Sequence, residues 1–339
     1  MTTAPDIHGP HIEYKYSIEE CDVNKSKQDA LQAYRRVRQN CLEHIRGPST
    51  YPIYRQLSKL AWHTAVFQTL NEARSLEPDA PVSGPAWELL REGYASLMAL
   101  GIRRLLDKDK RRISLAWVVE KLEKNSYLMT REFYVCHDGL PYDYETSRAK
   151  YYQAMSADER NETCFHPASG PEGWGMSEAM HEEFDKLCGY PSRRSRDDKI
   201  SKSVFASMKE LLSHESIATV ERMASKVIAH AVIIKPGENG IVMPTYQDVS
   251  TALETLVGLA NFICTGIFFD VHLGSVVPIY SGDPIESIDQ PWISSGNLSQ
   301  LSGFWHELCS SMNAWPGSER ITAMLIPPVQ QPTSADGFQ

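Results

Sequence analysis

Apolar residues recur at intervals of three and four along most of this chain, which is the spacing of one face of an α-helix. Alternating runs long enough to form a sheet are scarce. The pattern therefore predicts an all-α fold. The expected helices cover residues 27–45, 51–74, 85–106, 114–124, 201–212, 216–234 and 246–269, with one further helical stretch near 298–313.

Helix-breaking and capping residues set the expected ends of these helices. Gly47-Pro48 ends the first, and Pro78 with Pro81 ends the second. Ser114 stands where an N-cap is expected. The third helix places one stripe toward the core, namely Trp87, Leu90, Tyr94, Leu97, Met98, Gly101 and Leu105.

Shifts in this pattern divide the chain into five parts. Residues 1–26 form an N-terminal extension, and residues 27–135 form the first part of a helical bundle. The helical pattern weakens over residues 136–198, which we interpret as an irregular inserted subdomain. Residues 199–270 supply the second part of the bundle, and residues 271–339 form a polar C-terminal extension.

The charge balance limits the classes of partner. The chain has 43 acidic and 34 basic side chains, a net charge of -9, so it cannot coat nucleic acid as a diffuse polycation. The uncharged run of 15 residues from Thr255 to Phe269 is shorter than the roughly 20 that a membrane helix needs. No secretory leader is recognisable, so we expect a cytoplasmic protein with no membrane contact.

Common catalytic and metal-binding motifs are missing. The sequence has no Walker-type phosphate loop, no GxSxG elbow, no HExxH and no GxGxxG. The insertion collects metal-competent side chains that make no CxxC pair, so we expect buried thiols there, with no metal and no cofactor. These side chains are Cys136, His137, Cys164, His166, His181 and Cys188.

A row of basic side chains on the helix predicted at 216–234 is the first candidate site. Arg222, Lys226 and His230 follow at intervals of four, opposite the apolar face that includes Ile217, Val220 and Ala224. Two permanent cations and an imidazole that titrates near neutral pH can hold an RNA phosphate and move a proton beside it. The alternative is a solvated helix face whose cations lie near the helix C-terminus.

A basic segment at residues 103–112 is the second candidate. It holds six bases and two acids in ten residues, and its arginines are Arg103, Arg104, Arg111 and Arg112. We expect Arg103 to pair with Asp107 along the helix. The segment is either a phosphate-binding footprint or a helix end followed by a solvated turn.

These residues together resemble the HEPN superfamily, in the branch of AbiU-like abortive-infection proteins. The resemblance rests on RRLLDKDKRRISL (Arg103–Leu115), SKVIAHA (Ser225–Ala231) and TYQDVSTALETLVGLANFI (Thr245–Ile263). It implies a helical bundle that forms a homodimer, and a metal-independent endoribonuclease of a bacterial defence or toxin system. In active members an Arg and a His, four to six residues apart on one helix, meet the same pair of a second subunit.

The resemblance implies that His230 and Arg222 are catalytic. Lys226, Arg103, Arg104, Arg111 and Arg112 would then bind the RNA substrate. Seven residues separate Arg222 from His230 here, and three separate Lys226 from it. Because of this departure, a catalytically inactive helical module that binds or senses RNA or a protein partner, such as an antitoxin, stays open as the alternative.

Overall fold

The computed structural model describes residues 13–49, 51–76, 84–109, 111–154, 168–228, 243–278 and a few positions between 297 and 307. These parts contain no strand; a lone antiparallel bridge joins Thr130 to Lys199. The all-α fold is confirmed. The chain divides into two compact units, Met1–Ile279 and Tyr280–Gln339.

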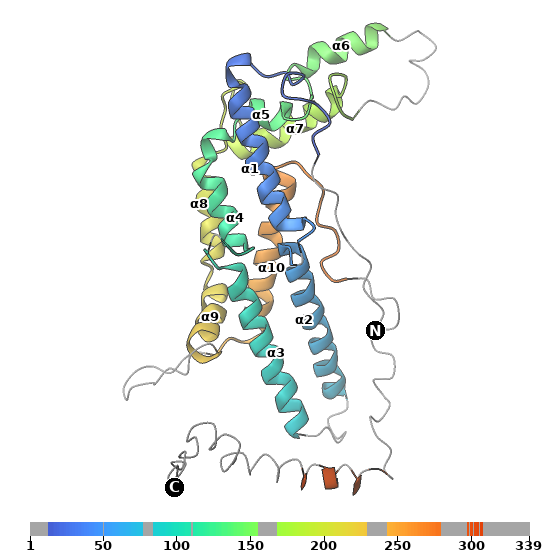
Figure 1. Ribbon diagram of the computed structural model, residues 1–339, viewed down its shortest axis with the longest axis vertical. Coiled ribbons are helices and arrows are strands. Elements are labelled where there is room, and N and C mark those ends of the chain that lie inside the picture. The colour runs from blue at the N-terminus through green and yellow to red at the C-terminus, as the bar shows by residue number, and fades with distance from the viewer. Residues whose placement is uncertain are drawn as a thin grey trace, which may run out of the picture. The chain divides into compact units, whose positions relative to one another are not determined.

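The first unit contains ten α-helices in its described parts (Figure 1). In chain order they are α1 (Gln28–Arg46), α2 (Ile53–Leu76), α3 (Gly84–Leu105), α4 (Leu115–Lys124), α5 (Arg131–Cys136), α6 (Tyr144–Ala154), α7 (Trp174–Cys188), α8 (Lys202–Leu212), α9 (Glu215–Met223) and α10 (Tyr246–Phe262). Short 3-10 turns at Lys25–Lys27 and Ser126–Leu128 precede α1 and α5. Two π-helical turns, η4 (Ala224–Ile228) and η5 (Ile263–Ile267), continue α9 and α10.

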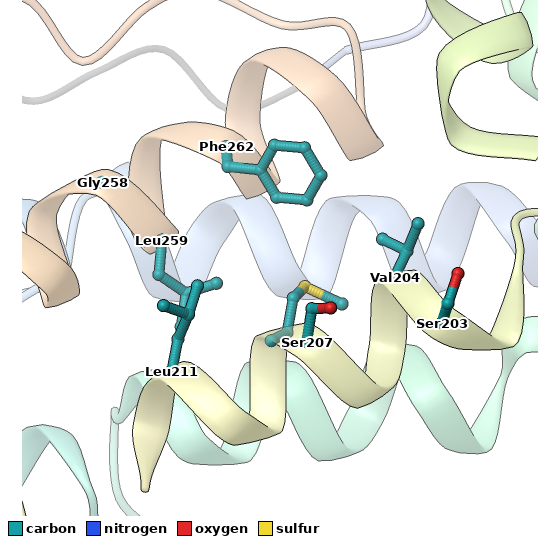
Figure 2. Close-up of a pocket in the computed structure, with 8 residues that line it drawn as sticks. Ser203, Val204, Ser207, Leu211, Gly258, Leu259 and Phe262 are labelled. Atoms are coloured by element: carbon teal, nitrogen blue, oxygen red, sulfur yellow. The ribbon is translucent and has the colours of Figure 1, made fainter. Parts of the chain in front are cut away.

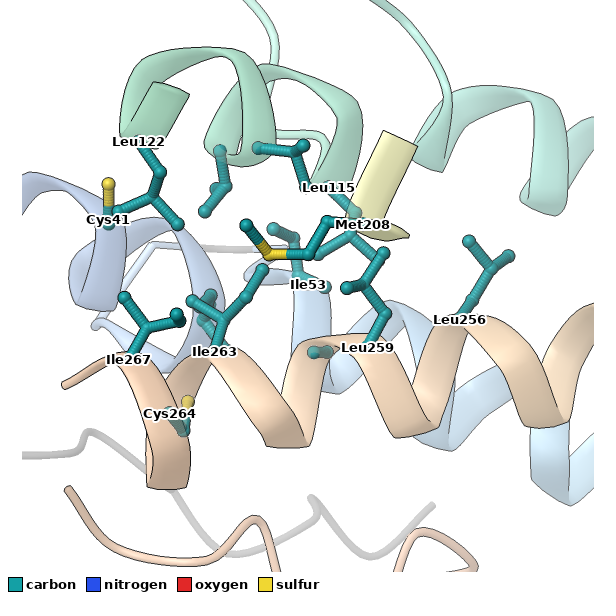
Figure 3. Close-up of a cluster of buried hydrophobic side chains, with 14 of the residues drawn as sticks. Cys41, Ile53, Leu115, Leu122, Met208, Leu256, Leu259, Ile263, Cys264 and Ile267 are labelled. Atoms are coloured by element: carbon teal, nitrogen blue, oxygen red, sulfur yellow. The ribbon is translucent and has the colours of Figure 1, made fainter. Parts of the chain in front are cut away.

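The last long helix, α10, occupies the middle of the bundle. It packs against α2, α3, α8 and α9, and its π-helical continuation packs against α7 (Figure 1). Buried side chains of α10 pack with those of α1, α2, α4 and α8 in one hydrophobic core (Figure 3). Elements far apart in sequence are thereby fixed to one apolar centre.

A glycine sets how closely α2 and α3 approach. A Cβ atom added to Gly101 would lie 2.5 Å from the Cδ2 atom of Leu60, which is itself 4% exposed. The absence of that Cβ lets the two helices pack at this point. Leu90 and Leu97, which we expected in the core stripe of α3, are instead 42% and 37% exposed, and Ile102 is fully buried. The buried face of α3 is therefore rotated about the helix axis from the face that the sequence pattern predicted.

Ordinary capping chemistry explains several helix starts. The hydroxyl of Ser114 accepts a hydrogen bond from the amide of Trp117, as predicted, and also donates to the carbonyl oxygen of Asp107. α10 begins with a capping box in which Thr245 and Asp248 bond each other's backbone amides. Ser201 caps α8 by accepting a hydrogen bond from a backbone amide of the first turn.

The stretch at 136–198 is more regular than expected. It contains α6 and α7, and α7 buries Phe184 and Leu187 in the main core. The expectation of an irregular subdomain is therefore wrong for these residues. Of the Cys and His side chains singled out there, Cys164 and His166 lie outside the described residues.

Residues of both expected extensions pack against the helical bundle. Tyr16 of the N-terminal part contacts Gly139 and Gly170, both with positive φ, where any Cβ would collide with its side chain. At the other end, Leu273 and Val276 still pack against the core. In the second unit the described residues between 299 and 307 are helical, within the stretch expected at 298–313, and the rest of that stretch is not described.

One helix of the described chain is long and apolar enough to cross a bilayer. This is Tyr246–Ile267, the combination of α10 and η5, and half of its apolar window is buried inside the protein. A core helix passes the same test of length and composition. Its packing in the bundle centre accounts for its apolar character.

Candidate functional site

The first candidate site lies at the end of α9. His214 caps this helix through Nδ1, which accepts from the amide of Ser216 at 3.3 Å. Ile217, Val220 and Ala224 are buried, so the predicted apolar face is correct as far as Ala224. The opposite face leaves Arg222 exposed.

The helix does not continue to residue 234 as a regular α-helix through the described residues. It becomes the π turn η4 at Ala224, in which each bond spans five residues rather than four. The wider turn changes the angle between successive side chains. Arg222 and Lys226 are both exposed. They were expected in line at i and i+4 of one α-helix, but the π turn between them changes that spacing.

The third member of the row cannot be placed. His230 lies outside the described residues, as do residues 229–242 around it. In the described part of the chain, neither Arg222 nor Lys226 forms an ion pair. Both side chains are exposed to solvent.

The second candidate segment divides into two halves. Arg103 and Arg104 belong to the last turn of α3, where cations are favoured by the helix dipole. Arg111 and Arg112 lie in the following loop and pair with carboxylates. Arg111 Nη2 lies 2.7 Å from Asp109, and Arg112 Nη1 lies 3.2 Å from Asp107.

The expected pair of Arg103 with Asp107 is therefore wrong. α3 ends at Leu105, so Asp107 lies beyond the helix and faces the loop arginine instead. Its carboxylate also accepts the amide of Asp109, in a local turn. Exposed ion pairs of this kind contribute little, about 0–1 kcal/mol, so Arg111 and Arg112 can exchange their partners.

Helix packing brings the two basic regions onto neighbouring elements. α3, which ends in Arg103 and Arg104, packs against α9 and η4, which carry Arg222 and Lys226. Among the described residues no hydrogen bond or ion pair joins one group to the other. The two groups therefore lie on helices that pack against each other.

A buried basic cluster on α1 escaped the sequence prediction. Arg35 donates from Nε to the carbonyl oxygen of His137 at 2.7 Å, and its guanidinium lies 4.4 Å from the ring centre of Tyr14. Arg38 donates to the carbonyl oxygen of Phe268 at 3.2 Å and to Asp270 at 3.1 Å. These arginines clamp the N-terminal part, the end of α5 and the end of α10 together.

Burial also removes His137 from acid–base chemistry. It lowers the pKa of this imidazole to about 3, and the nearby charge of Arg38 acts in the same direction. The ring is neutral at pH 7. His137 therefore has a structural role in this cluster.

A third buried arginine, Arg131 on α5, contacts the C-terminal end of α7. Arg131 is completely buried, with its Nε 2.9 Å from Asp198 and its Nη2 2.8 Å from Asp185. Its guanidinium also lies 4.8 Å from the ring centre of Phe184. Burial lowers the pKa of the neighbouring His181 to about 4, and its Nε2 lies 2.9 Å from the carbonyl oxygen of Tyr142.

No group of three or more metal-competent side chains is assembled in the described parts. Cys188 contacts Arg131 Nη2 at 3.2 Å, and burial raises the pKa of the Cys188 and Cys136 thiols. Both thiols are protonated at neutral pH.

A surface groove of about 310 Å³ lies between α8 and α10 (Figure 2). Its lining residues are Ser203, Val204, Ser207, Met208, Leu211, Gly258, Leu259 and Phe262. None of these side chains is ionisable, so the groove has no group for acid–base or phosphate chemistry.

Comparison of the chain with protein-family models, with characterised proteins and with solved structures finds no match. The resemblance to the HEPN superfamily therefore rests on the quoted sequence segments.

Proposed function

We propose that this protein binds RNA through the basic end of α9 and cleaves it as a metal-independent endoribonuclease of a bacterial defence or toxin system. The observation that carries the proposal is the exposure of Arg222 and Lys226 without an ion-pair partner among the described residues. Arg103 and Arg104, on the neighbouring α3, extend the positive surface. The site of action would be the cytoplasm, under control of a protein partner or antitoxin.

The chemistry requires one proton-transfer group and two cations. His230 would take the proton from a ribose 2′-hydroxyl, whose oxygen then attacks the adjacent phosphorus. The bond to the 5′-oxygen of the next nucleotide breaks, and that oxygen receives a proton from the protonated imidazole of His230, which leaves a cyclic phosphate on the other fragment. Arg222 and Lys226 would stabilise the additional negative charge on the phosphate oxygens during this step.

One structural observation favours the second candidate function, a module that binds RNA without cleaving it. The π turn η4 interrupts the α-helical spacing between Arg222 and Lys226, next to the unusual seven-residue separation of Arg222 from His230. Such a site would bind the phosphate backbone of RNA but would not align His230 as a general base for cleavage.

Cleavage of a labelled RNA in EDTA separates the two functions. His230→Ala should reduce the cleavage rate about a hundredfold while leaving RNA affinity within about twofold. Lys226→Ala and Arg222→Ala should each weaken binding and lower its salt dependence by about one phosphate contact. Lys59→Ala, an exposed cation on α2, is the matched control and should change neither quantity.

The outcomes assign the function. Salt-dependent binding that Lys226→Ala weakens, with no cleavage by the wild type, would replace the nuclease by the binding module. Full cleavage by His230→Ala would exclude the proposed acid–base role. Equal binding by Lys226→Ala, Arg222→Ala and the control would exclude this surface as the RNA site.

A further inference from the structure

Two polar groups on one face of α1 are buried without a hydrogen-bond partner among the described residues. They are the hydroxyl of Tyr34 and the Nε atom of Arg38. Tyr34 is 0% exposed and Arg38 is 7% exposed. Because they are four positions apart in the helix, the two side chains lie next to each other. A buried donor without an acceptor is costly, so this pair calls for an acceptor that the described chain does not supply.

Both groups can donate a hydrogen bond at neutral pH. The Nε atom of arginine carries a proton and never accepts. Burial raises the pKa of Tyr34 above its ordinary value, so its hydroxyl also keeps its proton. One acceptor placed between the two side chains would therefore satisfy both.

Positive charge surrounds these donors. The side chains of Tyr34, Arg35, Arg38 and Arg46 fall within a sector of about 120° of α1. Asp270 lies 3.1 Å from Arg38 Nη2 and 2.7 Å from Arg46 Nη2, so one carboxylate serves two guanidinium groups. One of these two positive charges therefore has no carboxylate of its own.

Arg35 contributes a third positive charge. Its Nε donates to the carbonyl oxygen of His137 at 2.7 Å, and its Nη2 lies 2.8 Å from the carbonyl oxygen of Tyr16 and 3.1 Å from the Sγ atom of Cys21. These acceptors are uncharged, and the ring of His137 is neutral at pH 7 because burial lowers its pKa to about 3. The direct contacts of Arg35 therefore leave its charge unbalanced.

Two further carboxylates lie near the cluster. Asp138 follows His137 and accepts a backbone amide of the N-terminal part. Glu183 on α7 lies 2.6 Å from Lys186, which balances its charge. Asp270 and Asp138 together offset two of the three arginines, so the described groups keep an excess of one positive charge. In a buried position such an excess favours a bound anion.

We propose that α1 carries a chloride site, in which Tyr34 Oη and Arg38 Nε donate hydrogen bonds to one enclosed ion. A halide carries the single negative charge that the cluster lacks, and it accepts hydrogen bonds without donating any. Both donor atoms are buried, so the ion is shut off from solvent and from the phosphates of an RNA chain. A water molecule supplies an acceptor but leaves the excess positive charge in place. The inference does not depend on the proposed RNA cleavage.

Binding of this ion is coupled to folding. Its donors lie on α1, whereas Asp270, which holds the Arg38 guanidinium in place, comes 232 positions later in the chain. The unfolded chain does not keep these groups together. The ion therefore binds the folded chain and stabilises it.

Thermal melting of the full chain at fixed ionic strength tests the site. Exchange of sodium gluconate for sodium chloride, from about 1 to about 300 mM chloride, should raise the melting temperature of the wild type by about 4 °C. Tyr34→Phe removes one donor and should reduce this shift to about 1 °C or less. Tyr127→Phe, at a tyrosine that is 61% exposed, is the matched control and should keep the full shift.

The order of the melting temperatures separates ion binding from ordinary packing. In gluconate, Tyr34→Phe should melt at or above the wild type, because it removes a buried hydroxyl that has no partner without the ion. In chloride the order should reverse. A hydroxyl that only packs in the core would give the same order in both salts.

Bromide locates the ion directly, because it replaces chloride and scatters X-rays anomalously. Crystals of the full chain grown in sodium bromide should show an anomalous peak within hydrogen-bond distance of both Tyr34 Oη and Arg38 Nε. Crystals of Tyr34→Phe under the same conditions should lose most of this peak.

Three results would overturn the proposal. Equal melting temperatures of the wild type in chloride and gluconate would show that water or nothing accepts from the two donors. A full chloride shift in Tyr34→Phe would place the stabilising ion elsewhere. Bromide peaks at exposed arginines alone would indicate an adventitious ion only.

Discussion

Arginine has two opposite uses in this protein, and sequence reasoning recognises one of them. Arg222 and Arg104 are exposed and stand in basic patterns that can be identified directly. Arg131 is fully buried, and Arg35 and Arg38 are nearly so. Each pairs with carboxylates or carbonyl oxygens far away in the chain. The sequence alone does not show which distant residues will pair with these arginines. An exposed position is therefore the natural prediction for them.

The two buried histidines make stability depend on pH. Their folded pKa values, about 3 for His137 and about 4 for His181, lie below the ordinary value of 6.5. The unfolded chain therefore binds more protons than the folded chain below about pH 6.5, and stability falls as the pH drops through this window. We expect the free energy of unfolding to fall by about 3 kcal/mol between pH 7 and pH 5.

Urea unfolding at a series of pH values measures this loss. His181→Gln keeps a donor for the carbonyl oxygen of Tyr142 but cannot titrate, so it should reduce the slope between pH 7 and pH 5 by about half. An unchanged slope would show that His181 is protonated in the folded protein.

A substitution at Gly101 tests the close approach of α2 and α3. Gly101→Val would push a side chain into Leu60 and should destabilise the protein by about 2 kcal/mol, the usual scale of overpacking. Gly258→Ala is the matched control, because a Cβ there meets nothing within 4 Å and alanine favours the helix. Urea midpoints that shift equally for both variants would contradict the proposed contact.

At the scale of the element, helix positions were largely predictable. Seven helices begin and end within a few residues of the expected positions, apart from the ends of α9 and α10, because proline, glycine and capping serine punctuate a clear apolar period. The π turns that end α9 and α10 were not predicted, since they depend on packing and leave the residue types unchanged. α7 was missed although Trp174, Ser177, Met180, Phe184 and Leu187 repeat at helical spacing.

The N-caps provide a prediction at this scale. Ser114→Ala removes the cap of α4 and also the buried hydrogen bond to the Asp107 carbonyl, so it should cost about 2 kcal/mol. Ser201→Ala removes an N-cap that is partly exposed and should cost about 1 kcal/mol or less. Thermal melts of the two variants provide the comparison, and an equal loss would mean that the Asp107 contact contributes nothing.

The whole molecule divides close to residue 279, later than the boundary expected at 271. Tyr54 donates to the carbonyl oxygen of Ser275 at 2.8 Å, and the amide of Leu273 donates to Asn261 at 3.1 Å. Residues 271–278 are therefore attached to the bundle. The segment is too short to show a helical apolar period, which explains why its attachment was not predicted.

Two truncations test this boundary. A chain that ends at Pro278 should melt cooperatively and within a few degrees of the full chain. A chain that ends at Asp270 loses Leu273 and Val276, which pack partly buried against the core, and should be less stable by about 2 kcal/mol. Loss of cooperative melting on removal of residues 279–339 would show that the second unit is required for folding of the first.

The central position of α10 has a consequence for synthesis. Asp270, which follows η5, pairs with Arg38 on α1, 232 positions earlier. At about 5–20 residues per second, ribosomes need roughly 12–46 s to add that stretch. During this time α2 and α3 lack the part of their packing that α10 supplies in the folded chain. Nascent chains of this protein should therefore depend on chaperones until α10 leaves the exit tunnel.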